Sequence, residues 1–282
     1  SSKQISEEEY KTLITYNHPN IISLYEVFND EDYQYIVMDY CSKGTLEKLG
    51  KVSNENFVTY AKQMLQAIEY CHENHITNLN LMPKNILVDQ YNHIKLCSFG
   101  NKEEKSNLEH LKRKEMIFKA PEVLQHKKFD EQQADIWSLG ITFYYMAVGS
   151  YPFIKQTRDE TKKAIVYSEF NFENQKIEPQ IRFLISKMIT KNSFARPSVR
   201  KLLRFPLFSN NNLNHKLNLL SASGRRNSLT GINIPSFIII DKNNDIEKEN
   251  QMTDVHCYQS VAVHPSMQRI HIHPTILVSK PN

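Results

Sequence analysis

Glycine is scarce in this sequence. Only seven glycines occur among the 282 residues, at positions 44, 50, 100, 140, 149, 224 and 231. No two of them begin the G-x-G-x-x-G spacing that lets a backbone approach phosphate groups closely. The sequence as given therefore contains no glycine-rich loop able to cradle a nucleotide.

Cysteine is sparse as well, and its spacing is uninformative. The four cysteines, at 41, 71, 97 and 257, fit neither a metal-ligand pattern nor a disulfide framework. We interpret them as small core residues of a protein in a reducing compartment, with the cytoplasm as the default expectation and the nucleus as the alternative.

Two further absences restrict the partners that we expect. The longest apolar run, residues 141–148, is far shorter than a membrane span. The chain has 35 Lys and Arg against 31 acids, and these charges are mixed along the sequence instead of gathered into a basic face. We therefore expect neither a membrane nor nucleic acid as a partner.

What is present indicates an α+β domain, since 40% of the residues are apolar and suffice for a sizeable core. Residues 7–16 have the pattern of a helix end, and "HPNIISLYEVF" and "YQYIVMDY" predict a β-hairpin. Ser53 or Asn54 would cap a helix through "ENFVTYAKQMLQAIEYCHEN". Short strands are expected at 86–88 and 94–96, and helices in "DIWSLGITFYYMAVG", "IEPQIRFLISKMIT" and "SVRKLLRF".

The stretch "ITNLNLMPKNILVD", residues 76–89, has the form of an active-site loop, because a polar segment with a proline runs directly into an apolar strand. It contains no His, no Arg and no acid before Asp89. A site built on this loop would lack the usual acid–base groups.

Several ordered motifs resemble the eukaryotic protein kinase domain, most closely its calcium/calmodulin-dependent and AMP-activated branch. They are "HPNIISLYEVF", "YIVMDYCSKGTL", "YCHENHI", "PKNILVD", "IKLCSFG", "APEV", "DIWSLG" with "GSYPF", and "ARPS". Each is weak alone, but their order and spacing are specific. The resemblance implies a kinase-like domain over 1–208, with a partial N-lobe at 1–40 (helix C and two strands) and a complete, mainly α-helical C-lobe at 41–208.

The departures from the family pattern concern its charged groups. Asn80 stands at the position of the catalytic Asp, Met82 at that of the catalytic-loop Lys, and Ser98 at that of the metal-binding Asp. Asn85, the family's second metal ligand, is retained. An amide can form hydrogen bonds but is neither basic nor negative, and a hydroxyl is a weak substitute for an anionic magnesium ligand.

By resemblance, other residues would line a degenerate nucleotide site. Glu9 aligns with the helix C glutamate, and Met38, Asp39 and Cys41 lie at the hinge, whose backbone could still meet an adenine edge. The strands that carry the glycine-rich loop and the partner Lys of Glu9 would precede residue 1. We therefore expect no cofactor, and ATP with magnesium only if the domain is active after all.

Four residues would have structural roles if the resemblance holds. Glu122 and Arg196 would form the ion pair that anchors the activation segment, Asp135 would hold the backbone of the catalytic loop, and Trp137 would pack on the central helix.

Residues 209–282 differ in composition and predict a largely disordered tail, because they are rich in Asn and Ser without a sustained period. Ser228 in "GRRNSLT" resembles a site for a basophilic kinase, and the alternative is an unmodified segment. "SFIII", residues 236–240, is either a weak docking strand or a chance apolar run. The spacing of the tail histidines and cysteine fits no metal site; they are His256, Cys257, His264, His271 and His273.

The sequence thus predicts a catalytically inactive kinase-like domain that binds or regulates proteins, possible partners being an active kinase or its substrate. The alternatives are an active serine/threonine kinase that transfers the γ-phosphate of ATP, and a non-functional kinase fragment.

Overall fold

The structure of the protein is a computed structural model. It describes residues 14, 17–29, 33–77, 79–97, 114–172, 176–209 and 236–241. The described residues belong to two compact units, one containing residues 23–40 and 236–241, the other residues 17–22 and 41–209.

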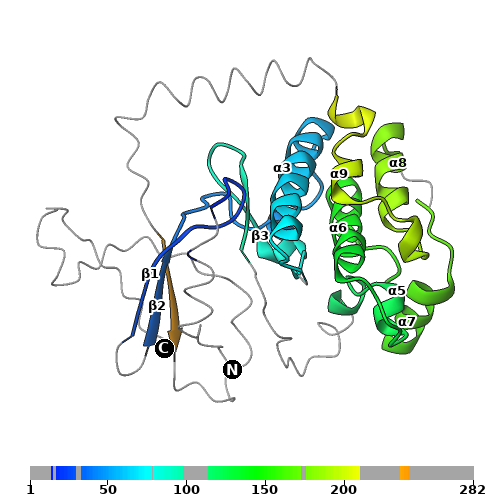
Figure 1. Ribbon diagram of the computed structural model, residues 1–282, viewed down its shortest axis with the longest axis horizontal. Helices are drawn as coiled ribbons and strands as arrows, with labels where there is room; N and C mark the ends of the chain where they lie inside the picture. The colour runs from blue at the N-terminus through cyan, green and yellow to red at the C-terminus, as the bar shows by residue number, and fades with distance from the viewer. Residues whose placement is uncertain are drawn as a thin grey trace, which may run out of the picture. The chain divides into compact units, whose positions relative to one another are not determined.

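The first unit is a three-stranded antiparallel sheet in the order β1-β2-β5 (Figure 1). Strands β1 (Leu24–Asn29) and β2 (Tyr33–Met38) form the predicted hairpin. Ile36, Val37 and Met38 of β2 are buried. Of the predicted helix at 7–16 only Ile14 is described, in helical conformation.

The third strand, β5 (Ser236–Asp241), lies in the segment that we expected to be largely disordered. It contains "SFIII", for which the sequence left a docking strand and a chance apolar run as alternatives. It pairs antiparallel with β2 along its whole length. A run of β-branched and aromatic residues favours strand formation once a neighbouring edge offers hydrogen bonds, and composition over a long window does not register so short a run. Apart from Ser209, the rest of 209–282 lies outside the described residues.

The second unit is mainly helical, as expected for the C-lobe. Its helices are α2 (Leu46–Leu49), α3 (Asn54–Glu73), α5 (Pro121–Leu124), α6 (Glu131–Val148), α7 (Arg158–Tyr167), α8 (Pro179–Met188) and α9 (Val199–Leu202). Three short 3₁₀ turns accompany them: η1 (Pro83–Asn85), η2 (Ser193–Ala195) and η3 (Pro206–Phe208). Strands β3 (Ile86–Val88) and β4 (Ile94–Leu96) form a small hairpin at the predicted positions.

Helix α3 begins where the sequence predicts, because the hydroxyl of Ser53 accepts a hydrogen bond from the amide of Asn56 at 3.2 Å. Its apolar face includes Phe57, Met64 and Leu65, all at most 1% exposed. The ring of Phe57 meets that of Phe143 on α6 edge to face, at 5.5 Å between centroids. This packing joins the two longest helices of the described chain.

Helix α6 lies between α3 and α8 (Figure 1). It is buried on nearly every side and ends at Gly149, whose left-handed φ of 86° suits glycine. At Gly140 a Cβ atom would lie 2.9 Å from Cβ of Met188 on α8. The close approach of α6 and α8 therefore requires glycine at this position.

Helix α7 was not predicted. It begins with a capping box, in which Thr157 accepts from the amide of Glu160, and Glu160 accepts from that of Thr157, each at 3.2 Å. Its buried face is limited to Thr161, Ala164 and Ile165, too few apolar positions for a clear helical period.

Within the described part of the chain, no helix is both long and apolar enough to cross a membrane.

Candidate functional site

Residues 79–85 precede β3 and are hydrogen-bonded to helix α6. The amide of Leu79 donates to Oδ1 of Asp135 at 3.0 Å, and the carbonyl of Leu81 accepts from Oγ1 of Thr142 at 2.5 Å. Leu79 and Leu81 are each 2% exposed. Two buried side chains of α6 thus fix the backbone on both sides of Asn80.

Asp135 has a second partner, because its Oδ2 lies 3.1 Å from Nε2 of His72 on α3. The carboxylate is 4% exposed, and a buried carboxylate is tolerated when hydrogen bonds satisfy its oxygens. Asp135 therefore ties the loop to both long helices.

Asn80 is half-buried and adopts a left-handed backbone with φ of 45°, a conformation in which Asn is several-fold enriched. Its carbonyl accepts from the amide of Met82 at 2.8 Å and from Nδ2 of Asn85 at 2.9 Å. The side-chain nitrogen of Asn85 thus braces the turn of the loop.

The loop from Leu79 to Asn85 has one charged side chain. Nζ of Lys84 lies 3.1 Å from Oε1 of Glu115 and is paired there. Met82 is 7% exposed and neutral. The loop therefore presents no carboxylate, and its only cation already has a partner.

Asp89, the first acid after the loop, belongs to the turn between β3 and β4. Its Oδ1 accepts from the amides of Tyr91 and His93 at 2.8 Å each, and its Oδ2 lies 3.1 Å from Nδ1 of His93. Burial alone would raise the pKa of Asp89, but these hydrogen bonds outweigh it and the pKa is lowered. Asp89 is thus an ionised turn residue with both oxygens occupied.

Glu122 and Arg196 form a buried, bidentate ion pair. Nη1 lies 2.6 Å from Oε1 and Nη2 lies 2.8 Å from Oε2, and the Arg196 side chain is fully buried. The guanidinium also donates to the carbonyls of Gln133 and Thr190, at 2.8 Å each. The charge of Arg196 is therefore both paired and hydrogen-bonded.

Trp137 lies beside this pair and is fully buried. Its Nε1 donates to the carbonyl of Ile117 at 3.1 Å, and its ring stacks on Phe153 at 5.9 Å. Cζ of Arg196 lies 5.3 Å from the indole centroid and Nζ of Lys191 lies 5.5 Å from it. Burial, and then the nearby charge of Arg196, lower the pKa of Lys191 to about 8.

Of the three predicted hinge residues, Asp39 accepts hydrogen bonds and the other two, Met38 and Cys41, are buried. Oδ2 of Asp39 accepts from the amide of Ser23 at 3.0 Å, and Oδ1 accepts from the hydroxyl of Tyr25 at 2.6 Å. Met38 and Cys41 are 5% and 4% exposed. Glu9, Ser98 and Ser228 lie outside the described residues.

Comparison with known sequences decides the family. The profile of the protein kinase domain matches residues 1–208. The chain belongs to the protein kinase domain family.

Curated relatives of this kinase domain include several protein kinases. It is 29% identical to sperm motility kinase 1 of Mus musculus, covering 70% of this chain and 42% of that protein. It is 35% identical to calcium-dependent protein kinase 6 of Plasmodium berghei (strain Anka), covering 71% of this chain and 14% of that protein. It is 28% identical to CBL-interacting serine/threonine-protein kinase 20 of Arabidopsis thaliana, covering 70% of this chain and 46% of that protein. The chain thus spans less than half the length of these three relatives.

The described residues of this kinase domain include no group of three or more His, Cys, Asp or Glu side chains that could hold a metal ion. The tail histidines and Cys257 lie outside these residues.

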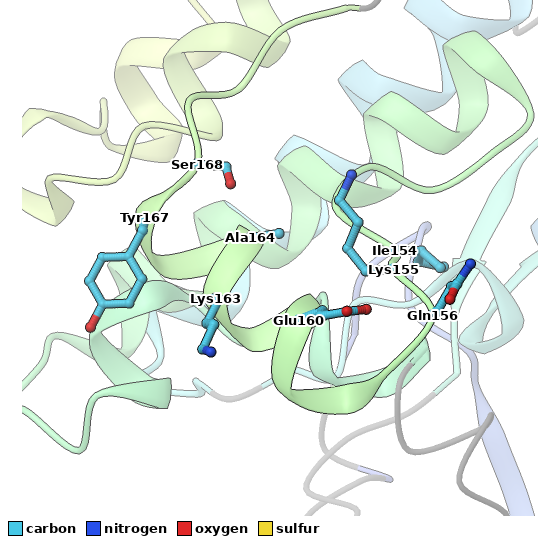
Figure 2. Close-up of a pocket in the computed structure, with 8 residues that line it drawn as sticks. All are labelled: Ile154, Lys155, Gln156, Glu160, Lys163, Ala164, Tyr167 and Ser168. Carbon is cyan, nitrogen blue, oxygen red and sulfur yellow. The ribbon is translucent and has the colours of Figure 1, made fainter.

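A concave surface of the kinase domain lies on helix α7, away from residues 79–85 in sequence. It is an open pocket of about 1010 Å³ (Figure 2). Figure 2 shows its walls coming from α7 and from the segment before it, with these lining residues: Ile154, Lys155, Gln156, Glu160, Lys163, Ala164, Tyr167 and Ser168.

This pocket combines exposed apolar side chains with lysines. Ile154 and Tyr167 are 40% and 78% exposed and provide apolar surface. Two lysines line it, while the carboxylate of its one acid, Glu160, accepts the capping hydrogen bond from Thr157. Sequence reasoning missed this surface because it did not predict α7, although "TRDE" at 157–160 has the spacing of a capping box.

Proposed function

We propose that this kinase domain does not transfer phosphate and acts instead by binding and regulating other proteins. The observation that supports this most is the composition of the loop Leu79–Asn85, which has no carboxylate and has Asn80 at the position of the catalytic base. General-base catalysis contributes roughly 10²–10⁴ in rate, and the Asn80 amide has no basic group to supply it.

The neighbouring residues offer no replacement within the described part of the chain. Met82 is buried and neutral, and Lys84 is paired with Glu115. Both carboxylate oxygens of Asp89 already accept hydrogen bonds in the β3–β4 turn. None of these described residues therefore replaces the catalytic base. None of them replaces the cation that would balance charge on a transferring phosphoryl group either.

A second candidate function is an active serine/threonine kinase that uses ATP and magnesium. It is favoured by the relatives, which are named as kinases, and by the retained Asn85. In the structure, however, Nδ2 of Asn85 donates to the carbonyl of Asn80, so this side chain already has a role in the loop. A non-functional fragment remains the third reading, and it predicts that the chain lacks a cooperative unfolding transition.

We further propose that the partners are proteins, namely an active kinase or its substrate, in the cytoplasm. The pocket on α7 supports a protein partner, because exposed apolar side chains beside lysines would accept an apolar side chain flanked by an acid. Neither a nucleotide nor a metal is part of this proposal.

The first test is a phosphotransfer assay with radiolabelled ATP, magnesium and a high concentration of the full chain. We expect no incorporation into the chain itself or into generic Ser/Thr peptides, because the catalytic base is replaced. An active protein kinase serves as the positive control. Incorporation that persists in Lys162→Ala, an exposed change on α7, but disappears in Asn80→Ala would overturn the proposal.

The second test is thermal unfolding with and without ATP and magnesium, followed by the fluorescence of Trp137, the single tryptophan. A competent site at 100 times its dissociation constant adds about 2.7 kcal/mol to the free energy of unfolding. For a domain of this size that corresponds to a rise in Tm of roughly 5–10 °C. We expect no magnesium-dependent rise, and a rise of that size would favour the active enzyme.

A further inference from the structure

The charges of the whole chain are mixed, but one long stretch carries charge of a single sign. Residues 179–240 contain Lys and Arg and no Asp or Glu. The described part of this stretch, 179–209, comprises α8, η2, α9 and η3. Exposed cations of these elements have no acid of the same segment to balance them, so the segment presents a basic surface.

Four of the seven Lys and Arg side chains in residues 179–209 already have partners. They are Arg182 over the ring of Phe172, Lys191 on the carbonyls of Ala164 and Ile165, Arg196 on Glu122, and Arg200 on Glu69 and Glu73. The other three, Lys187, Lys201 and Arg204, are exposed. Among the residues that the structure describes, none of these three pairs with a carboxylate.

Two phenylalanines lie between these cations. The ring centroids of Phe183 on α8 and Phe205, which precedes η3, are 5.6 Å apart, and Phe183 is 51% exposed. Nζ of Lys187 lies 5.1 Å from the centroid of the Phe183 ring. Exposed aromatic surface therefore adjoins a cation on α8.

The opposite side of the phenylalanine pair is also basic. The amide of Arg204 donates to the carbonyl of Lys201 at 3.2 Å, so these residues lie one helical turn apart. Side chains three residues apart in such a turn share a face. Both cations thus lie on the turn that leads to Phe205. We call the surface formed by Phe183, Lys187, Lys201, Arg204 and Phe205 the basic aromatic surface.

This combination favours a ligand that is apolar at its centre and anionic around it. Exposed aromatic rings bury area against an apolar side chain, and the surrounding cations attract carboxylates and select against basic partners. Residues 210–235, which follow in the chain, contain no acid either. The adjoining segment therefore supplies no counter-charge of its own.

The number of cations favours a protein over a phosphate-bearing partner. Anionic lipid is typically bound by clusters of about 4–8 Lys and Arg, and nucleic acid by a basic face that follows the phosphate backbone. The basic aromatic surface has three cations without a carboxylate partner among the described residues, and two phenylalanines between them.

We propose that the basic aromatic surface binds an acidic segment of a partner protein, in which an aromatic or aliphatic side chain stands among carboxylates. The proposal rests on the proposed function only for the class of partner. Phosphate transfer by the chain would overturn that function and leave the binding measured here unchanged, so the two can fail separately.

The test measures binding of a fluorescent peptide, Glu-Asp-Glu-Phe-Asp-Glu-Asp, to the full chain by anisotropy. The variant is Lys201→Glu/Arg204→Glu, which reverses two charges of the surface. The matched control is Lys127→Glu/Lys128→Glu, because these lysines are exposed, lie outside the surface and change the net charge equally. The peptide Gln-Asn-Gln-Phe-Asn-Gln-Asn controls for binding without charge.

We expect the surface variant to bind the acidic peptide at least about ten-fold more weakly than the wild type, since two attractions become repulsions. The Lys127→Glu/Lys128→Glu chain should bind as the wild type does, and added salt should weaken binding to both. Equal losses in the two variants would reduce the effect to net charge and overturn the proposal. Binding of the uncharged peptide as tightly as the acidic one would overturn it as well.

The contribution of the rings is tested by Phe183→Ala, with Phe194→Ala as its control, because Phe194 is exposed and has no ring contact within the described chain. Phe183→Ala should weaken binding of the acidic peptide, and Phe194→Ala should not. A Phe183→Ala chain that binds like the wild type would overturn the assignment of an apolar anchor. Since all the replaced side chains are exposed, unfolding followed by Trp137 fluorescence should show that each variant is folded.

Three parallel measurements distinguish other occupants. Vesicles that contain phosphatidylserine and a single-stranded oligothymidine replace the peptide in two of them. Binding of either that is lost in Lys201→Glu/Arg204→Glu, without binding of the peptide, would overturn a protein partner. In the third, Asp245→Asn/Glu247→Gln/Glu249→Gln removes acids that lie further along this chain. Much tighter binding of the acidic peptide to that variant than to the wild type would show that the chain's own segment occupies the surface, which also overturns the proposal.

Discussion

Replacing Glu122 by alanine is expected to lower the free energy of unfolding by about 3–5 kcal/mol, because it leaves the buried charge of Arg196 without its counter-ion. The Arg196 side chain is fully buried and binds both carboxylate oxygens of Glu122 at 2.6 and 2.8 Å. For a domain of this size, each kcal/mol changes Tm by roughly 2–4 °C. The expected fall in Tm is therefore about 6–20 °C, and the fluorescence of Trp137 reports it.

The chain offers a matched control for this prediction. Arg200 and Glu73 also form an Arg–Glu ion pair, with Nη2 2.6 Å from Oε1, but through a single contact and with side chains that are 65% and 57% exposed. Solvent screens an exposed pair of this kind, so Glu73→Ala should leave Tm nearly unchanged. Similar losses from Glu122→Ala and Glu73→Ala would mean that burial does not determine the cost of breaking the pair.

Replacing Trp137 by alanine is expected to cost a similar amount, about 3–5 kcal/mol. The change removes a fully buried indole, opens a cavity, and leaves the carbonyl of Ile117 without its donor. It also removes the ring on which Arg196, Lys191 and Phe153 pack. Circular dichroism should follow this unfolding, since the variant has no tryptophan.

Trp137→Phe separates the two contributions, because it keeps an aromatic ring and loses the indole N–H. It should be intermediate in Tm between the wild type and Trp137→Ala. Phe194 is 97% exposed, so Phe194→Ala is a control that removes an aromatic ring outside the core. This variant should have nearly the Tm of the wild type. A Trp137→Ala chain as stable as Phe194→Ala would show that the indole is not part of the core.

Much of the fold could be predicted because local signals agreed with the final packing. Ser53 marks the start of α3, Gly149 marks the end of α6, and the short apolar runs at 86–88 and 94–96 form β3 and β4. Helix α7 was missed, because its stability comes from a capping box and three buried residues instead of a long apolar face. For β5 the sequence left a docking strand and a chance apolar run as alternatives inside a largely disordered tail, because its hydrogen-bonding partners lie about two hundred residues away in sequence.

In the candidate site, too, residue identities could be read from the sequence, whereas side-chain pairings required the structure. The identities of Asn80 and Met82 are visible in the sequence, and they indicate which chemical groups the loop lacks. The structure adds that Nδ2 of Asn85 braces the loop, that Lys84 pairs with Glu115, and that Asp39 accepts hydrogen bonds from Ser23 and Tyr25. None of these pairings follows from a motif, since each depends on which side chains the fold brings within hydrogen-bond distance.

The sequence by itself determined the family of this protein, the order of its main elements and the absence of charge at Asn80 and Met82, because these properties depend on residue type and local spacing. Only the tertiary structure decided that β5 completes the sheet of β1 and β2 and that Ile154 and Tyr167 share a pocket on α7. The physical reason is that strand pairing and side-chain packing join residues that are not neighbours in the chain. Whether such contacts form depends on the geometry of their neighbours and not on the preferences of the segments alone.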